Sequence, residues 1–254
     1  MRDVERVAGW MNGGRGKYLS VVVLAAVLTA RTAVGQEMPM QASDAQVTDS
    51  GDLQYCLTNL AAQPATAWSV TVRVTDPNGM VIRHSAITTD EYRAEAHRGM
   101  ASDEQLSASL LRPHRPRRFV VPGPFDQRLQ LTVTPLAMVF LDGSSVGHAQ
   151  LIASVFQRRA AEREARRDIL KQLRDVRTHY SGIAALKEAI NRLSRPATTD
   201  PGHTHRMVEQ QLRDALTHAE AGRIDAGKAL DDQLDLISRE YQLAVQHSIP
   251  RRED

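Results

Sequence analysis

The pattern of hydrophobic and polar positions divides the chain at Ala149. From residue 52 onward apolar residues alternate with polar ones, which is typical of strands that bury one face. After Ala149 the apolar residues recur at intervals of three and four, the spacing of one face of a helix. The pattern predicts an α+β chain with strands first and helices second. The change of period also indicates that the helices have a hydrophobic core of their own.

Two hairpins stand out in the first half. Apolar residues alternate with polar ones over residues 68–74, and Asp76-Pro77-Asn78-Gly79 then turns the chain into a second strand. Asp142-Gly143 predicts another tight turn, because glycine adopts the positive φ angles that such turns need. About six or seven short strands over residues 52–148 predict an antiparallel β-sandwich of immunoglobulin-like type.

The helical region is expected over residues 149–247. Its first helix runs from about His148 to Leu193 and carries a coiled-coil-like stripe, formed by Ile169, Leu173, Val176, Tyr180, Ile183, Leu186, Ile190 and Leu193. Residues 196–203 interrupt it, and Gly222 and Asp225 are a candidate helix stop and the next N-cap. The result is a three-helix bundle or, if Gly222 only kinks the chain, an α-helical hairpin. Residues 248–254 are expected to form a disordered tail.

Residues 1–35 have the features of a signal peptide. Arg15 and Lys17 precede an apolar run over residues 18–30, and Ala33-Val34-Gly35 suits cleavage before Gln36. The run is shorter than the roughly 20 residues that span a bilayer, so cleavage is favoured over an uncleaved membrane tether. The polar residues 36–51 are expected to be a flexible linker. The protein is therefore expected in the periplasm or at the cell surface.

Composition narrows the possible functions. Residues 1–35 hold five basic and two acidic residues, a net of +3, so the rest of the chain falls from +2 to −1. This near-neutral charge and the 4% aromatic content argue against a nucleic-acid partner. One cysteine, Cys56, excludes an internal disulfide, and it is expected to act as a small buried hydrophobe.

Motif searches give no catalytic, cofactor or metal site. The stretch from Gly222 to Lys228 matches G-x4-G-K, but Ala229 replaces the hydroxyl that binds Mg²⁺, and the surrounding pattern is helical. His203 and His205 lie near Asp200 in a loop bounded by proline and glycine, where solvated histidines are the ordinary outcome. No cofactor is expected.

Two arginine clusters remain. Arg112, Arg115, Arg117 and Arg118 are a possible anion-binding site, although a charged edge strand that discourages aggregation is the more common role. Arg158 to Arg167 also contains Glu162 and Glu164 and is expected to form a solvated, salt-bridged helix face.

The order of these parts resembles a group of uncharacterised exported bacterial proteins with an immunoglobulin-like or fibronectin type III-like sandwich and a charged helical tail. The resemblance covers roughly residues 53–165. It rests on Asn59-Leu60, Asp76-Pro77-Asn78-Gly79, Leu111-Arg112-Pro113, Val139-Phe140-Leu141-Asp142-Gly143, Gly147 and Arg158-Arg159. Where the group has Pro-Gly-Glu, this chain has Pro113-His114-Arg115. The resemblance implies the fold and no particular activity.

The expected function is that of an exported structural or interaction protein of the cell envelope, and not an enzyme. Its partner would be another protein or a second copy bound through the helical stripe, and a membrane only if residues 1–35 are retained. Two alternatives remain open. One is an envelope hydrolase with a site outside known motifs, and the other is a binder of an anionic envelope polymer through residues 112–118.

Overall fold

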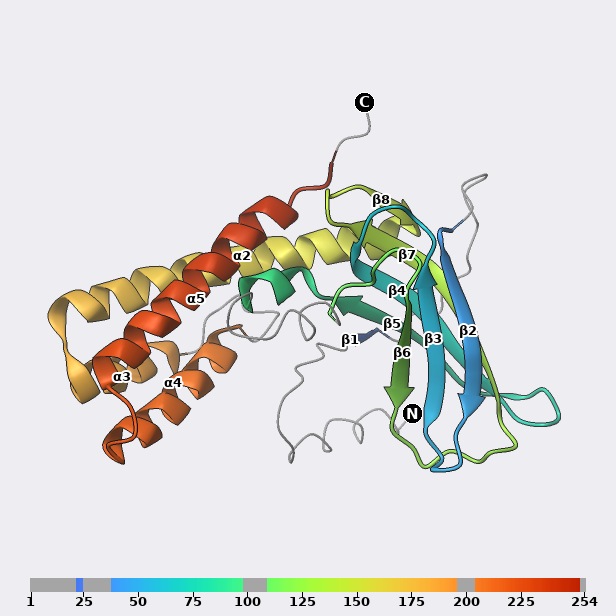
Figure 1. Ribbon diagram of the computed structural model, residues 1–254, viewed down its shortest axis with the longest axis horizontal. Coiled ribbons are helices and arrows are strands. Elements are labelled where there is room, and N and C mark those ends of the chain that lie inside the picture. Colours follow the sequence, from blue (N-terminus) through green and yellow to red (C-terminus); the bar gives the residue numbers. More distant parts are fainter. Residues whose placement is uncertain (1–21, 25–37, 98–108, 196–203, 252–254) are drawn as a thin grey trace.

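The computed structural model describes residues 22–24, 38–97, 109–195 and 204–251, and within them the chain is α+β (Figure 1). Two antiparallel sheets are followed by four C-terminal helices. The strands are β1 (Val22–Leu24), β2 (Met40–Val47), β3 (Leu53–Asn59), β4 (Ala65–Thr75), β5 (Val81–Asp90), β6 (Pro116–Val121), β7 (Gln130–Phe140) and β8 (Ser145–Gly147). The helices are the 3-10 helix η1 (Tyr92–His97) and the α-helices α2 (Ala149–His179), α3 (Gly182–Leu193), α4 (Thr204–Glu220) and α5 (Ala226–His247).

The two sheets share one hydrophobic core. The larger sheet has the strand order β1-β5-β4-β7-β8, and the smaller has the order β2-β3-β6. Alternate side chains of β4, from Trp68 to Val74, meet Leu53, Tyr55 and Leu57 of β3 in a single buried cluster. The predicted alternation over residues 68–74 therefore corresponds to the buried face of the central strand.

The linker expected over residues 36–51 is wrong for most of its length. Residues Met40–Val47 form β2, which pairs antiparallel with β3 and has a register shift between Ser43 and Gln46. Because β2 is an edge strand, only part of it faces the core, and Met40 is its one fully buried residue. Its other apolar residues, Ala42, Ala45 and Val47, are only partly buried against the core, so the strand gives a weak pattern.

Both predicted hairpin turns are present. Gly79 lies in the turn between β4 and β5, and Gly143 lies in the turn between β7 and β8. Their φ angles are +83° and +85°. His114 also lies in the left-handed region, at φ +55°, and its N–H donates to the carbonyl of Asn59. A positive φ angle is uncommon for a residue other than glycine, and His114 and Asp44 are the two such residues among those the structure describes.

The helical region has four helices, where two or three were expected. The first predicted helix divides at Tyr180, whose backbone is extended, and Gly182 follows at φ +55°. Because the chain turns here, Tyr180 and Ile183 are 40% and 39% exposed, whereas Leu186 is fully buried. The prediction of one continuous stripe is therefore wrong at its centre.

The remaining helix boundary is confirmed. Helix α4 ends at Glu220, Gly222 has φ +67°, and the Asp225 side chain accepts the Lys228 N–H at the start of α5. The helices share a core that is separate from the core of the sheets. The interruption expected over residues 196–203 lies outside the described residues.

The chain ends are only partly described. Val22–Leu24, from the apolar run of the expected signal, pairs antiparallel with β5, and the cleavage site lies outside the described residues. The tail expected to be disordered begins with Ser248, which is buried, and Arg251 forms an ion pair with Asp142 at 2.9 Å. Among the described residues no helix is both long and apolar enough to span a membrane.

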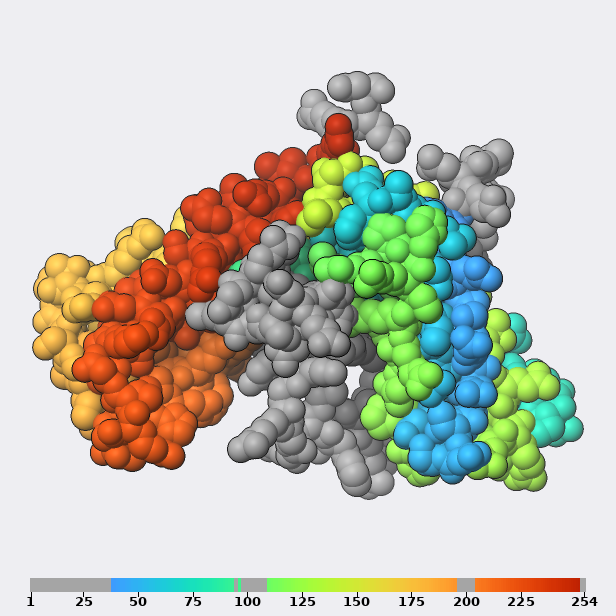
Figure 2. All heavy atoms as spheres, viewed as in Figure 1, coloured from blue at the N-terminus to red at the C-terminus, as the bar shows by residue number. Residues whose placement is uncertain are grey.

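The helices project from one side of the sheets (Figures 1 and 2). Helix α2 begins directly after β8, and α5 runs beside it back toward the sheets. The start of α2 and the end of α5 therefore meet the sheets at one junction.

Candidate functional site

The junction between the sheets and the helices begins with a small apolar contact. Val155 and Phe156 of α2 pack against Ala67 of β4 and Val139 of β7. Over about the next three turns of the same helix face lie Arg159, Glu162 and Arg166, all buried. The helix thus presents charged groups to the interior where it leaves the sheet.

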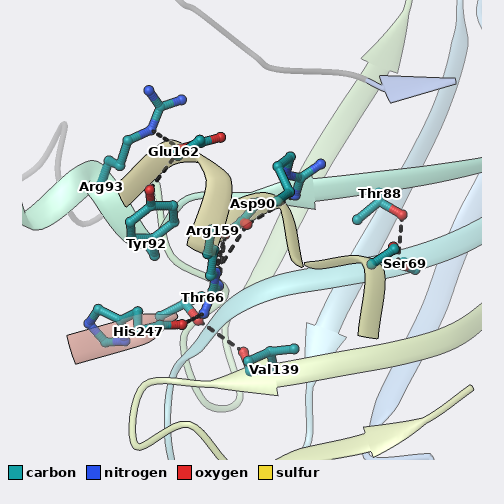
Figure 3. Close-up of polar contacts among 12 residues, drawn as sticks. Thr66, Ser69, Thr88, Asp90, Tyr92, Arg93, Val139, Arg159, Glu162 and His247 are labelled. Carbon is teal, nitrogen blue, oxygen red and sulfur yellow. Dashed lines mark hydrogen bonds and ion pairs between the residues drawn. The ribbon is translucent and has the colours of Figure 1, made fainter. Parts of the chain in front are cut away.

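Arg159 is the centre of this junction and is fully buried. Its Nη2 and Nε atoms lie 2.7 and 3.1 Å from the two carboxylate oxygens of Asp90, the last residue of β5 (Figure 3). Arg158 donates to the same carboxylate at 3.0 Å. Arg159 also donates to Thr66 Oγ1 at 3.0 Å and to the carbonyl of His247 at 3.2 Å. One guanidinium therefore joins β4, β5 and the end of α5.

Two aromatic rings complete the surroundings of Arg159. Its guanidinium carbon lies 4.9 Å from the ring centre of Tyr92 and 5.7 Å from that of Phe156. Burial alone would raise the pKa of Asp90, but the charges and hydrogen bonds of Arg159 and Arg158 outweigh it and lower the pKa. The Asp90 carboxyl is therefore ionised at neutral pH and accepts directed hydrogen bonds from both guanidinium groups.

Arg166 is the centre of a second cluster, two turns along α2. Its Nε atom lies 3.0 Å from Glu240 of α5, and its Nη1 atom lies 3.2 Å from Glu162. The Tyr92 hydroxyl donates to Glu162 at 2.7 Å, and Arg93 lies 3.8 Å from the same carboxylate (Figure 3). This cluster joins η1, α2 and α5.

The pKa shifts of the second cluster favour its ionised, paired state. Burial raises the pKa of Tyr92, and the neighbouring Glu162 raises it further, so the hydroxyl keeps its proton as a donor. Burial would lower the pKa of Arg166, but the interactions with Tyr92, Glu240 and Glu162 outweigh it and raise the pKa. The Tyr92 hydroxyl therefore remains a donor to Glu162, and Arg166 keeps its positive charge.

The expectation of a solvated face for residues 158–167 is wrong at its inward positions. Arg159, Glu162 and Arg166 lie at steps of three and four, and they continue the phase of the apolar stripe. The steps from Val155 to Val176 are four, three, four, three, four and three, through Val155, Arg159, Glu162, Arg166, Ile169, Leu173 and Val176. Charged residues in phase with an apolar stripe were the sequence signal for a buried network. Nothing in the pattern pointed to Asp90 or Glu240.

The four arginines of the candidate anion site are not equivalent. Arg112, Arg115 and Arg118 are exposed, whereas Arg117 is half-buried. The Arg117 guanidinium lies 5.1 Å from the ring centres of both Trp68 and Phe119. It also donates to the carbonyl of Ser109. Arg117 is therefore part of the packing. Of the three exposed arginines, Arg118 lies on the edge strand β6, and Arg112 and Arg115 lie in the segment before it.

Glu91 lies beside the junction, and the pKa of its carboxyl group is far above the ordinary value. It follows Asp90 directly and is 3.8 Å from Arg117, with its side chain 19% exposed. Burial raises the pKa of Glu91 to about 7, the charge of Asp90 adds to the rise, and Arg117 and Arg93 oppose it. Glu91 therefore changes its protonation near neutral pH.

The other sequence candidates are not brought together. The stretch from Gly222 to Lys228 covers the turn after α4 and the start of α5, and the Lys228 ammonium lies 2.6 Å from the Asp232 carboxylate. His205 is buried in α4, while Asp200 and His203 lie outside the described residues. Among the described residues no three His, Cys, Asp or Glu side chains are grouped to hold a metal ion. Cys56 is half-buried on β3.

Fold and junction together define an α+β protein whose two parts are joined by buried ion pairs. No protein family model matches the chain, and no curated protein matches it. A solved structure with some similarity is the 1.85 Å X-ray structure of a hypothetical protein from Peptoclostridium difficile 630. It is 9% identical and has a TM-score of 0.29, with 45% of this chain and 89% of that chain covered.

Proposed function

We propose that the protein is an exported structural and interaction protein of the cell envelope, in which a helical arm is held in a fixed orientation on an immunoglobulin-like β-sandwich. The observation that carries the proposal is the complete burial of Arg159 and Arg166, each paired with a carboxylate from a different element. Buried pairs of this kind contribute little net stability but restrict the geometry of the groups around them. They suit a protein that presents a rigid surface.

The distal end of the arm supports a contact with a partner. Tyr180 and Ile183 flank the turn between α2 and α3, far from the sheets, and both are exposed. Arg177 and Asp231 form an ion pair at 2.6 Å near this turn. Exposed apolar side chains with charged neighbours are common at protein interfaces. A partner protein or a second copy would bind here.

Site-specific crosslinking in the native envelope tests this proposal. A photoreactive residue at position 183 is expected to form a crosslinked product, whereas one at the exposed Lys171 of α2 is the matched control. Intact-mass analysis of the same protein is expected to show Gln36 as the first residue. Retention of residues 1–35, or equal crosslinking at both positions, would contradict the proposal.

The exposure of Arg112, Arg115 and Arg118 favours a second candidate, binding of an anionic polymer. Arg115→Ser with Arg118→Ser would then weaken heparin binding and make it less dependent on salt. Arg117→Ser is the comparison, because it removes packing against Trp68 and is expected to lower stability. Unchanged heparin binding in the double variant would exclude this function.

A further inference from the structure

Three consecutive large apolar side chains are exposed at the tip of the β4–β5 hairpin. Met80, Val81 and Ile82 are 66%, 45% and 54% exposed. Other exposed apolar residues of the sheets, such as Leu60 and Val120, are not part of such a run. The tip protrudes beyond the neighbouring strand ends at the right of Figures 1 and 2. The sheet core covers none of these three side chains, so the tip is free to contact something outside the chain.

Local hydrogen bonds fix the shape of this tip. The Asp76 carboxylate accepts the backbone N–H groups of Asn78 and Met80 at 2.9 and 2.8 Å. The Asp76 N–H donates to the Met80 carbonyl, and Gly79 supplies the positive φ. The apolar side chains are thus presented on a closed turn, with little conformational entropy left to lose on binding.

Basic side chains lie directly behind the apolar tip. In the β4–β5 register Arg73 is opposite His84, and Arg83 is opposite Val74. Arg73 and His84 are exposed, and the Arg83 guanidinium lies 6.0 Å from the ring centre of Phe125. The turn itself contains one carboxylate, Asp76, which accepts two N–H groups, against the two guanidinium groups of Arg73 and Arg83.

The adjoining loop adds no net charge to this basic layer. Its acidic residue Asp126 is paired with Arg128 at 2.6 Å. From the tip inward, the surface is therefore apolar first and cationic second.

We propose that the β4–β5 hairpin tip is a docking site for an anionic lipid bilayer. Met80, Val81 and Ile82 would enter the boundary with the acyl chains, while Arg73 and Arg83 meet lipid phosphates. This order matches the order of chemistry with depth in a membrane surface. A narrow turn offers much less than the roughly 800 Å² per partner of a stable protein interface, whereas lipids close around a small tip.

This contact does not depend on the apolar run of residues 18–30 or on the proposed role of the helical arm. Vesicle sedimentation with the full chain separates the possibilities, because every variant retains residues 1–35. The probes are vesicles of phosphatidylglycerol mixed with phosphatidylcholine, and vesicles of phosphatidylcholine alone. Ile82→Asp and Met80→Ser are the test variants, and Val120→Asp, on an exposed site of β6, is the matched control.

The proposal expects binding to the anionic vesicles that is at least about tenfold weaker for Ile82→Asp and unchanged for Val120→Asp. Arg73→Gln is expected to weaken only the binding to anionic vesicles, and added salt should do the same. Circular dichroism checks that each variant folds, and Met80→Ser, outside any strand, gives an answer even if Ile82→Asp is unfolded.

Three results would overturn the proposal. The first is equal vesicle binding by wild type, Ile82→Asp and Met80→Ser, which would assign binding to another part of the chain. The second is equal binding to both kinds of vesicle. The third is a dimer in light scattering that Ile82→Asp dissociates, with no vesicle binding, which would make a second copy the occupant.

Discussion

At the scale of single residues, the buried arginines decide how the two parts of the molecule are joined. Arg159 makes polar contacts with Asp90, Thr66 and the end of α5 while it is fully removed from water. Taking such a group out of water costs several kcal/mol, which the carboxylate and the carbonyl offset only if every contact is made. The junction is therefore intolerant of the loss of one partner.

Arg159→Met is expected to lower the free energy of unfolding by about 3–5 kcal/mol, because it leaves Asp90 buried with only Arg158 as a cationic partner. Arg167→Met is the matched control on the same helix. Arg167 is 65% exposed, so its pair with Glu164 is expected to contribute about 0–1 kcal/mol. Urea unfolding of both variants measures the difference, and equal losses would show that the buried pair has no special role.

Glu91 should make stability depend on pH. Its pKa is 4.5 in the unfolded chain and about 7 in the fold, so the folded state holds the extra proton between these values. The stabilisation is complete below about pH 4.5 and is lost as the pH rises through 7. The variant Glu91→Gln has no carboxyl group at this position and so does not titrate there.

The free energy of unfolding of wild type is therefore expected to fall more between about pH 5 and pH 8 than that of Glu91→Gln. Denaturant titrations at the two pH values measure this. Parallel pH profiles of the two proteins would show that Glu91 titrates as an ordinary exposed carboxyl.

At the scale of elements, local signals placed the strands and turns, and long-range contacts decided the rest. The hairpin at Asp76 and the N-cap at Asp225 follow from short sequences whose backbone needs are specific. Strand β2 was missed because its alternation is short and interrupted: Met40 and Ala42 pack on the sheet core, and the register then shifts between Ser43 and Gln46 before Val47 does so. Its assignment depends on pairing with β3.

The junction could be predicted only in part. Charged residues in phase with the stripe of α2 identify Arg159, Glu162 and Arg166 as inward-facing. Their partners Asp90 and Glu240 lie about 70 residues away along the chain, with separations of 69 and 74. No local pattern specifies such pairs, since they depend on how the sheets and helices meet.

Helix α3 offers a matched test of the corrected stripe. Ile183→Asp places a carboxylate at a 39% exposed position and is expected to change the free energy of unfolding by less than about 1 kcal/mol. Leu186→Asp places the same group in the fully buried core of the helices and is expected to cost about 3–5 kcal/mol. Thermal unfolding followed by circular dichroism compares the two variants. A larger loss of stability for Ile183→Asp than for Leu186→Asp would indicate that the apolar stripe continues through residue 183.

At the scale of the whole molecule, two hydrophobic cores are joined by one small apolar contact and two buried ion clusters. The sequence pattern indicated separate cores, and the structure has them. It also has a junction in which polar contacts connect β4, β5, η1, α2 and α5. We expect these contacts to make the two parts one mechanical and thermodynamic unit.

Scanning calorimetry measures whether the helices and the sheets unfold together. Wild type is expected to unfold in one transition whose calorimetric and van't Hoff enthalpies agree, because neither core opens while the junction is intact. With both Arg159→Met and Arg166→Met, the helices and the sheets are expected to unfold in two separate transitions. Two transitions in wild type, or one undivided transition after both arginines are lost, would contradict the account.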